Sequence, residues 1–132
     1  MNASSTVLQA SDLTGSPAWF PLAAADATTL CCVHLDEAAY RQASFLDQRL
    51  LHAAPAQALL SAAAAQGAAG QLRQRPHYVL HVGHVGSTLV SRLIGSCESF
   101  FSVREPALLR ALADGTGSPL PLAHLLALLG RT

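Results

Sequence analysis

A glycine-rich loop is the clearest candidate for chemistry in this sequence. The loop Gly83-His84-Val85-Gly86-Ser87-Thr88 follows a short apolar run, 77–82, and precedes residues 89–94, whose apolar side chains have helical spacing. Glycines let a backbone approach an anion closely, and the N–H groups at a helix N-terminus point toward it. The hydroxyls of Ser87 and Thr88 add further donors. The order of strand, loop and helix predicts a phosphate or sulfate site; the alternative is a glycine-rich turn that only packs.

The loop differs from the Walker loop of P-loop kinases and nucleotide hydrolases. That loop holds phosphates with a lysine, and this chain contains arginine but no lysine. Ser87 stands where the lysine would be, and His81 stands where the first glycine would be. His84 is then the nearest potential cation. A loop without lysine holds an ATP γ-phosphate with Mg²⁺ poorly. A site that works without metal is therefore favoured, and a kinase or hydrolase is the alternative.

A carboxylate follows the next apolar run. Residues 100–103 predict a strand, and Glu105 comes just after its end. Ligands of open α/β sheets bind at the carboxyl ends of strands, so we expect Glu105 and the loop to face one crevice. A carboxylate there can act as a general base. It can equally cap the helix that begins at Pro106 or pair with Arg104.

Arg92 lies one helical turn after Thr88 and either reaches an anion in the same crevice or stays solvated or ion-paired. The six histidines form no HxH, HExxH or Cys/His grouping with metal-ligand spacing, so no metal is predicted. The catalytic candidates are Glu105 and His84. The candidates for cofactor binding are Gly83, His84, Val85, Gly86, Ser87, Thr88 and Arg92.

The stretch HYVLHVGHVGSTLVSRL, followed by FFSVREPALLRALA, resembles the N-terminal part of sulfotransferase-family P-loop proteins. The likeness covers residues 76–114 and is carried by the GSTL motif and the downstream REP. It implies a P-loop NTPase-like parallel sheet flanked by helices. In that family the loop holds the 5′-phosphate of 3′-phosphoadenosine 5′-phosphosulfate (PAPS). Gly86, Ser87 and Thr88 take the glycine and hydroxyl positions, and His84 stands where the family usually has Lys or Arg.

The resemblance also implies a reaction. In several bacterial and tyrosyl-protein members, a glutamate at the position of Glu105 acts as the base toward the acceptor hydroxyl while 3′,5′-ADP leaves. The expected function is therefore PAPS-dependent sulfuryl transfer to an acceptor hydroxyl or amine, with PAPS as cosubstrate and no metal. The expected partners are this nucleotide and a small-molecule acceptor. A non-catalytic, truncated P-loop module is the alternative of a different class.

The expected elements divide near residue 76. Residues 1–75 predict an N-terminal arm with one strand, 28–35, and two helices, 37–51 and 56–66, the first capped by Asp36. Residues 76–132 predict the first βαβα part of a P-loop sulfotransferase-like domain. The predicted elements there are strand 77–82, helix 89–94, strand 100–103, helix 107–113 and a last apolar helix, 120–129. This alternation is typical of the α/β class.

Two βα units cannot close a doubly wound sheet, so we expect an N-terminal fragment that lacks the C-terminal part of its own domain and its 3′-phosphate site. Eight basic and eight acidic residues give no net charge, which argues against nucleic acid as a partner. A hydrophobic fraction of 51% with 12% charged residues excludes a disordered chain. No stretch predicts a membrane span or a secretory signal, and three cysteines without CxxC spacing predict reduced thiols in the cytoplasm.

Overall fold

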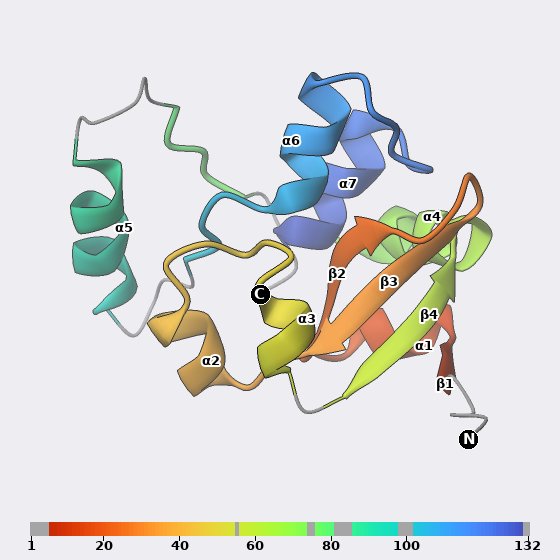
Figure 1. Ribbon diagram of the computed structural model, residues 1–132, viewed down its shortest axis with the longest axis horizontal. Coiled ribbons are helices and arrows are strands. Elements are labelled where there is room, and N and C mark those ends of the chain that lie inside the picture. The colour runs from red at the N-terminus through yellow and green to blue at the C-terminus, as the bar shows by residue number, and fades with distance from the viewer. Residues whose placement is uncertain (1–5, 55, 74–75, 81–85, 98–101, 131–132) are drawn as a thin grey trace.

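The computed structural model describes residues 6–54, 56–73, 76–80, 86–97 and 102–130 (Figure 1). A four-stranded sheet in the order β1-β4-β3-β2 lies at one side of the molecule. Its strands are β1 (Thr6–Leu8), β2 (Trp19–Ala24), β3 (Thr29–His34) and β4 (Gln57–Ser61).

The sheet is mixed. β1 runs parallel to β4, whereas β3 is antiparallel to both β4 and β2. The α/β class is therefore confirmed, but the expected all-parallel sheet is wrong for the residues described. Its strands also come from residues 6–61, where only one strand was predicted.

Seven helices are described. They are α1 (Ala10–Thr14), α2 (Glu37–Gln42), α3 (Leu50–Ala53), α4 (Ala62–Gln71), α5 (Ser87–Gly95), α6 (Ala107–Ala113) and α7 (Leu122–Leu129). α1 and α4 pack together behind the sheet, and α6 and α7 lie against β2 (Figure 1). α5 stands apart from the sheet, beyond α2. The helices predicted over 89–94, 107–113 and 120–129 are confirmed.

The predicted helix over 56–66 is wrong in its first half. Residues 57–61 form β4, the strand that pairs with β1 on one side and β3 on the other. Ala58 and Leu60 are buried in alternation, as one face of a strand requires. Ser61 then caps α4, its hydroxyl oxygen accepting from the Ala64 N–H at 3.1 Å. Pairing on both edges overrides the helix propensity of the Ala- and Leu-rich sequence.

The predicted helix over 37–51 is interrupted. Asp36 caps α2 as expected, with its carboxylate accepting from the Ala39 N–H at 2.7 Å, but α2 ends at Gln42. Leu46 bonds a distant segment instead. Its N–H donates to the Arg104 carbonyl at 3.0 Å, and its carbonyl accepts from the Ala107 N–H at 3.0 Å. These long-range bonds replace helical ones, while Leu46 remains in the core as the periodicity predicts.

The second half of the chain differs most from expectation. Residues 77–80, the described part of the predicted strand 77–82, belong to no strand and are exposed; Leu80 is 93% exposed. Ser102 and Val103, the described part of the predicted strand 100–103, are not in a strand either. Residues 81–82 and 100–101 lie outside the described residues. A short apolar run that has no neighbouring strand to pair with gains too little stability from hydrogen bonds and burial to form a strand.

None of the described helices is both long and apolar enough to cross a membrane. The described residues also contain no group of three or more His, Cys, Asp or Glu side chains arranged to hold a metal ion.

The three cysteines are thiols with different surroundings. Cys32 is fully buried in β3, Cys31 is partly buried, and Cys97 is exposed. Burial raises the pKa of the Cys31 thiol, which lowers the fraction of reactive thiolate. We expect iodoacetamide to label Cys97 first and Cys32 last, as followed by mass spectrometry of peptides over time. Labelling of Cys32 as fast as Cys97 would contradict the position of β3 inside the sheet.

Candidate functional site

The residue that precedes α5 has a left-handed backbone conformation. Gly86 has φ +80° and ψ +16°, in the left-handed region where side chains other than glycine are strained. A Cβ atom built on Gly86 would meet no other atom within 4 Å. The requirement for glycine therefore comes from the backbone conformation and not from crowding. Gly83, His84 and Val85 lie outside the described residues.

Ser87 and Thr88 occupy the first turn of α5 and are partly exposed. The first N–H groups of a helix have no partner within the helix, and no side chain among the described residues caps this end. The Val90 N–H returns to the Gly86 carbonyl at 3.1 Å and closes the first turn. This helix end presents N–H donors and two hydroxyls together, a combination that can bind an anion.

Polar contacts attach α5 to its neighbours. No described residue of α5 is buried, and its apolar side chains Leu89 and Leu93 are more than half exposed. The Ser91 hydroxyl bonds that of Ser102, and the Arg41 guanidinium donates to the Gly95 carbonyl. The bond from Arg41 joins α5 to α2, its neighbouring helix in Figure 1, and the bond to Ser102 joins α5 to the segment before α6.

Arg92 faces a pocket at the C-terminal half of α5. The pocket has a volume of about 170 Å³ and is bordered by α2, α5 and the segment before α6. Its lining residues are Tyr40, Arg41, Ser91, Arg92, Gly95, Ser96, Ser102 and Arg104. The lining does not include Gly86, Ser87 or Thr88, so the structure does not bring Arg92 into one described cavity with the loop residues.

Glu105 lies just before α6 in an unusual conformation. Its φ of +43° is the only positive value at a described residue other than glycine. Such a residue costs about 1–3 kcal/mol and persists where the surroundings impose it. On its N-terminal side, the backbone of Arg104 is fixed by Leu46, and on its C-terminal side Pro106 precedes α6. No glycine or asparagine in the sequence signals this turn.

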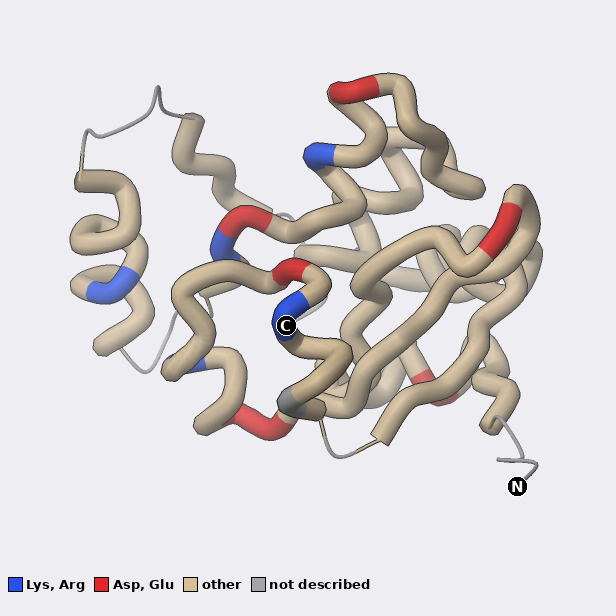
Figure 2. Tube along the Cα trace, in the orientation of Figure 1, with Lys and Arg blue, Asp and Glu red and all other residues tan. Residues whose placement is uncertain are grey.

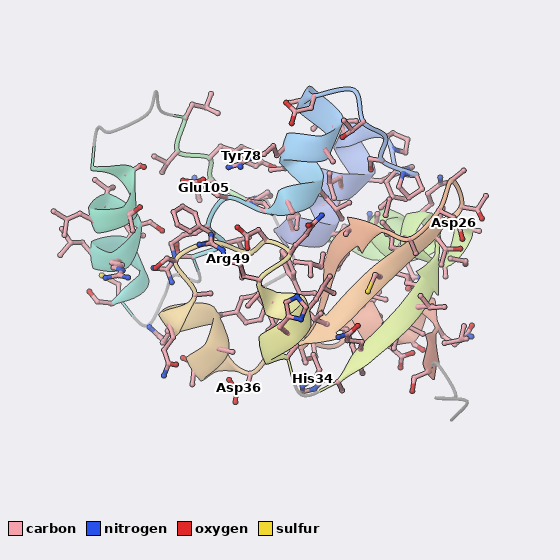
Figure 3. All side chains as sticks on the ribbon, in the orientation of Figure 1. Asp26, His34, Asp36, Arg49, Tyr78 and Glu105 are labelled. Carbon is pink, nitrogen blue, oxygen red and sulfur yellow. The ribbon has the colours of Figure 1, made fainter. Side chains whose placement is uncertain are left out.

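The Glu105 carboxylate accepts from the Arg110 guanidinium at 3.2 Å and is 34% exposed. The alternative of a pair with Arg104 is therefore wrong, because Arg110 is the partner. In the part of the chain that the structure describes, no hydrogen bond from a backbone N–H of α6 to the Glu105 carboxylate supports the alternative of a helix cap. Figure 3 shows Arg49 near Glu105. The hydrogen bonds that Arg49 donates to the Asp47 carboxylate, and less strongly the charge of Glu105, raise the pKa of Arg49.

Acidic and basic residues alternate along the chain around Glu105 (Figure 2). Among the described residues, no hydrogen bond or ion pair joins Glu105 to Gly86, Ser87 or Thr88. That they face one crevice therefore remains a prediction. The pocket residues Arg41, Ser102 and Arg104 were not predicted as site residues, since Arg41 is far from the other two in the sequence and no motif joins the three.

The geometry thus offers an uncapped helix N-terminus with two hydroxyls, an arginine-lined pocket, and a carboxylate in a constrained turn. Each can take part in binding or transferring an anionic group. No protein-family model, no curated protein and no solved structure matches this chain.

Proposed function

We propose that this chain provides the PAPS-binding part of a sulfotransferase, with the phosphosulfate held at the N-terminus of α5. The observation that supports this most is the left-handed Gly86 immediately before Ser87 and Thr88. Residues 76–114 then act as a phosphate-binding unit of the P-loop type. The three cysteine thiols are compatible with the cytoplasm as its compartment.

In this proposal the residues have distinct roles. The N–H groups and hydroxyls of Ser87 and Thr88 donate to the phosphosulfate oxygens, and His84 adds a donor when protonated. Glu105 takes the proton of the acceptor hydroxyl as that oxygen forms its bond to sulfur. The bond from sulfur to the phosphate oxygen breaks, and 3′,5′-ADP leaves with the electron pair.

Binding of 3′,5′-ADP tests the nucleotide site directly. Gly86→Val is expected to weaken it at least tenfold, because a β-branched residue at φ +80° costs about 1–3 kcal/mol and the turn must change shape. Isothermal titration calorimetry of the whole chain measures this affinity. Gly67→Val is the matched control, because Gly67 is an exposed helical glycine with no atom within 4 Å of an added Cβ.

Three results would reject the proposal. Equal affinity for 3′,5′-ADP in the Gly86→Val variant and the unsubstituted protein would remove the loop from the site. Preference for ATP with Mg²⁺ would favour the kinase or hydrolase alternative, and the absence of any nucleotide binding would favour a non-catalytic module.

A further inference from the structure

We propose that the pocket between α2, α5 and residues 102–104 is a second anion site, which binds a phosphate or sulfate group. It is separate from the helix N-terminus invoked above and does not depend on the proposed sulfuryl transfer. Three arginines and three serines line it, from segments far apart in the sequence.

Arg104 is the central observation. It is 7% exposed, and its Nη2 group donates to the carbonyls of Tyr40 at 2.9 Å and Arg41 at 2.7 Å. These bonds cap the C-terminal end of α2. The buried Nε atom has no hydrogen-bond partner in the described part of the chain. A buried donor on a charged group is costly to leave unpaired, so this N–H calls for an acceptor.

The charges around the pocket are unbalanced. Neither Arg92 nor Arg104 has a carboxylate within ion-pair distance among the described residues, whereas Arg41 pairs with Glu37 at 2.7 Å. Within the described ranges, Arg92 donates only to the Ser44 hydroxyl, at 3.3 Å. Burial, and then the charge of Arg92, lowers the pKa of Arg104. Three arginines therefore line one pocket, and of these only Arg41 has an ion pair with a carboxylate among the described residues, so a bound anion adds the missing negative charge.

Size and donor number narrow the ligand class. The volume of about 170 Å³ is smaller than the roughly 300–1,000 Å³ of pockets that enclose drug-sized ligands. It suits a single anionic group and not a whole nucleotide. Guanidinium groups match the oxygens of phosphate, sulfate and carboxylate. The Ser96 hydroxyl donates to the Leu93 carbonyl, and the Ser91 and Ser102 hydroxyls bond each other, so most donors for a ligand come from the arginines. The N–H groups that Arg92 and Arg104 leave unused exceed what the two oxygens of a carboxylate can accept, which favours a tetrahedral oxyanion.

Titration of the whole chain with inorganic phosphate, and separately with sulfate, tests the site. Sodium chloride keeps the ionic strength constant, and calorimetry measures the affinity. Arg92→Gln is expected to weaken binding about ten- to a hundredfold, because it removes a hydrogen bond to a charged group. Arg49→Gln is the matched control and leaves the affinity unchanged, since Arg49 is an exposed arginine outside the pocket.

Arg104→Lys is expected to weaken binding as well, and circular dichroism establishes whether that variant folds. Should it not fold, Ser102→Ala with Arg92→Gln supplies the same test. Repeating the titration with phosphoserine distinguishes the sources of the anion. Tighter binding of phosphoserine identifies a phosphorylated molecule as ligand, and binding of the inorganic ions alone identifies a free ion.

No saturable binding above the chloride control would overturn the inference. So would equal weakening by Arg49→Gln, which would indicate diffuse attraction. If Ser87→Ala weakens phosphate binding and Arg92→Gln does not, the ion binds at the start of α5. That result would support the proposed function and overturn the inference that the pocket binds the anion. If 3′,5′-ADP fails to bind while phosphate binding still depends on Arg92, the proposed function fails and the pocket stands.

Discussion

Replacing Glu105 with glutamine is expected to lower the rate of sulfuryl transfer by about 10²- to 10⁴-fold, the usual contribution of a general base. Glutamine has nearly the same size and can still accept a hydrogen bond from Arg110, so the turn before α6 is preserved. It cannot take the proton of the acceptor. Binding of 3′,5′-ADP should therefore remain unchanged. Release of 3′,5′-ADP from PAPS, with a simple phenol as acceptor, measures the rate.

Arg110→Gln is the matched control, because it removes the other half of the ion pair and leaves the carboxylate. This exposed pair contributes at most about 1 kcal/mol, so we expect a small change in rate. If Glu105→Gln lowers nucleotide affinity and rate equally, the residue serves the structure of the turn and not the reaction. Glu105→Gly separates these roles further, since glycine relieves the strain at φ +43° while removing the carboxylate.

Replacing Phe20 with alanine is expected to lower the free energy of unfolding by about 3–5 kcal/mol. Phe20 is 1% exposed in β2, and its ring meets that of Tyr40 edge to face, with centroids 5.9 Å apart. The substitution leaves a cavity and removes this aromatic contact. Since the whole stability of a domain is about 5–15 kcal/mol, the variant should be close to unfolding. Urea denaturation followed by circular dichroism gives the difference.

Val7→Ala provides the comparison, because Val7 lies in the same sheet but is 63% exposed. Its expected effect is within about 0.5 kcal/mol. A loss for Phe20→Ala no larger than for Val7→Ala would mean that β2 does not pack against the helices as described. The slope of the free energy of unfolding against urea concentration should be the same in both variants and in the unsubstituted protein. An equal slope would show that the substitutions change the stability of the folded state and not the compactness of the unfolded chain.

Local patterns predicted the helices of the second half and the cap at Asp36, since these depend on neighbouring residues. The strand β2 was not predicted, because it contains Pro21 and proline is rare inside strands. Pro21 is tolerated there since β2 is an edge strand and its register shifts between Pro21 and Ala23. The strand β4 was missed for another reason. Its pairing with β1 and β3 depends on residues that are distant in the sequence.

In the candidate site, too, local features could be predicted and long-range contacts could not. The left-handed turn at Gly86, followed by Ser87 and Thr88 at the start of α5, could be predicted because a glycine turn into a helix is a local structure. The pocket could not, because Arg41, Arg92 and Arg104 come together only after α2 and α5 are in place. The left-handed conformation of Glu105 was equally hidden, since it results from the bonds that Leu46 makes on either side.

The pairing of β1 with β4 has a consequence for how the chain assembles. Thr6 pairs with Ala58, so one edge of the sheet joins segments that are far apart along the chain, whereas β2 and β3 pair across a short turn at Asp26. Closing a long loop costs more entropy than closing a short one. During synthesis from the N-terminus, the β2–β3 hairpin can form while β1 is still without its partner. β1 can pair with β4 only after residue 60 has been synthesised. Until then, the short length of β1 leaves few unpaired backbone groups that could bond to other chains.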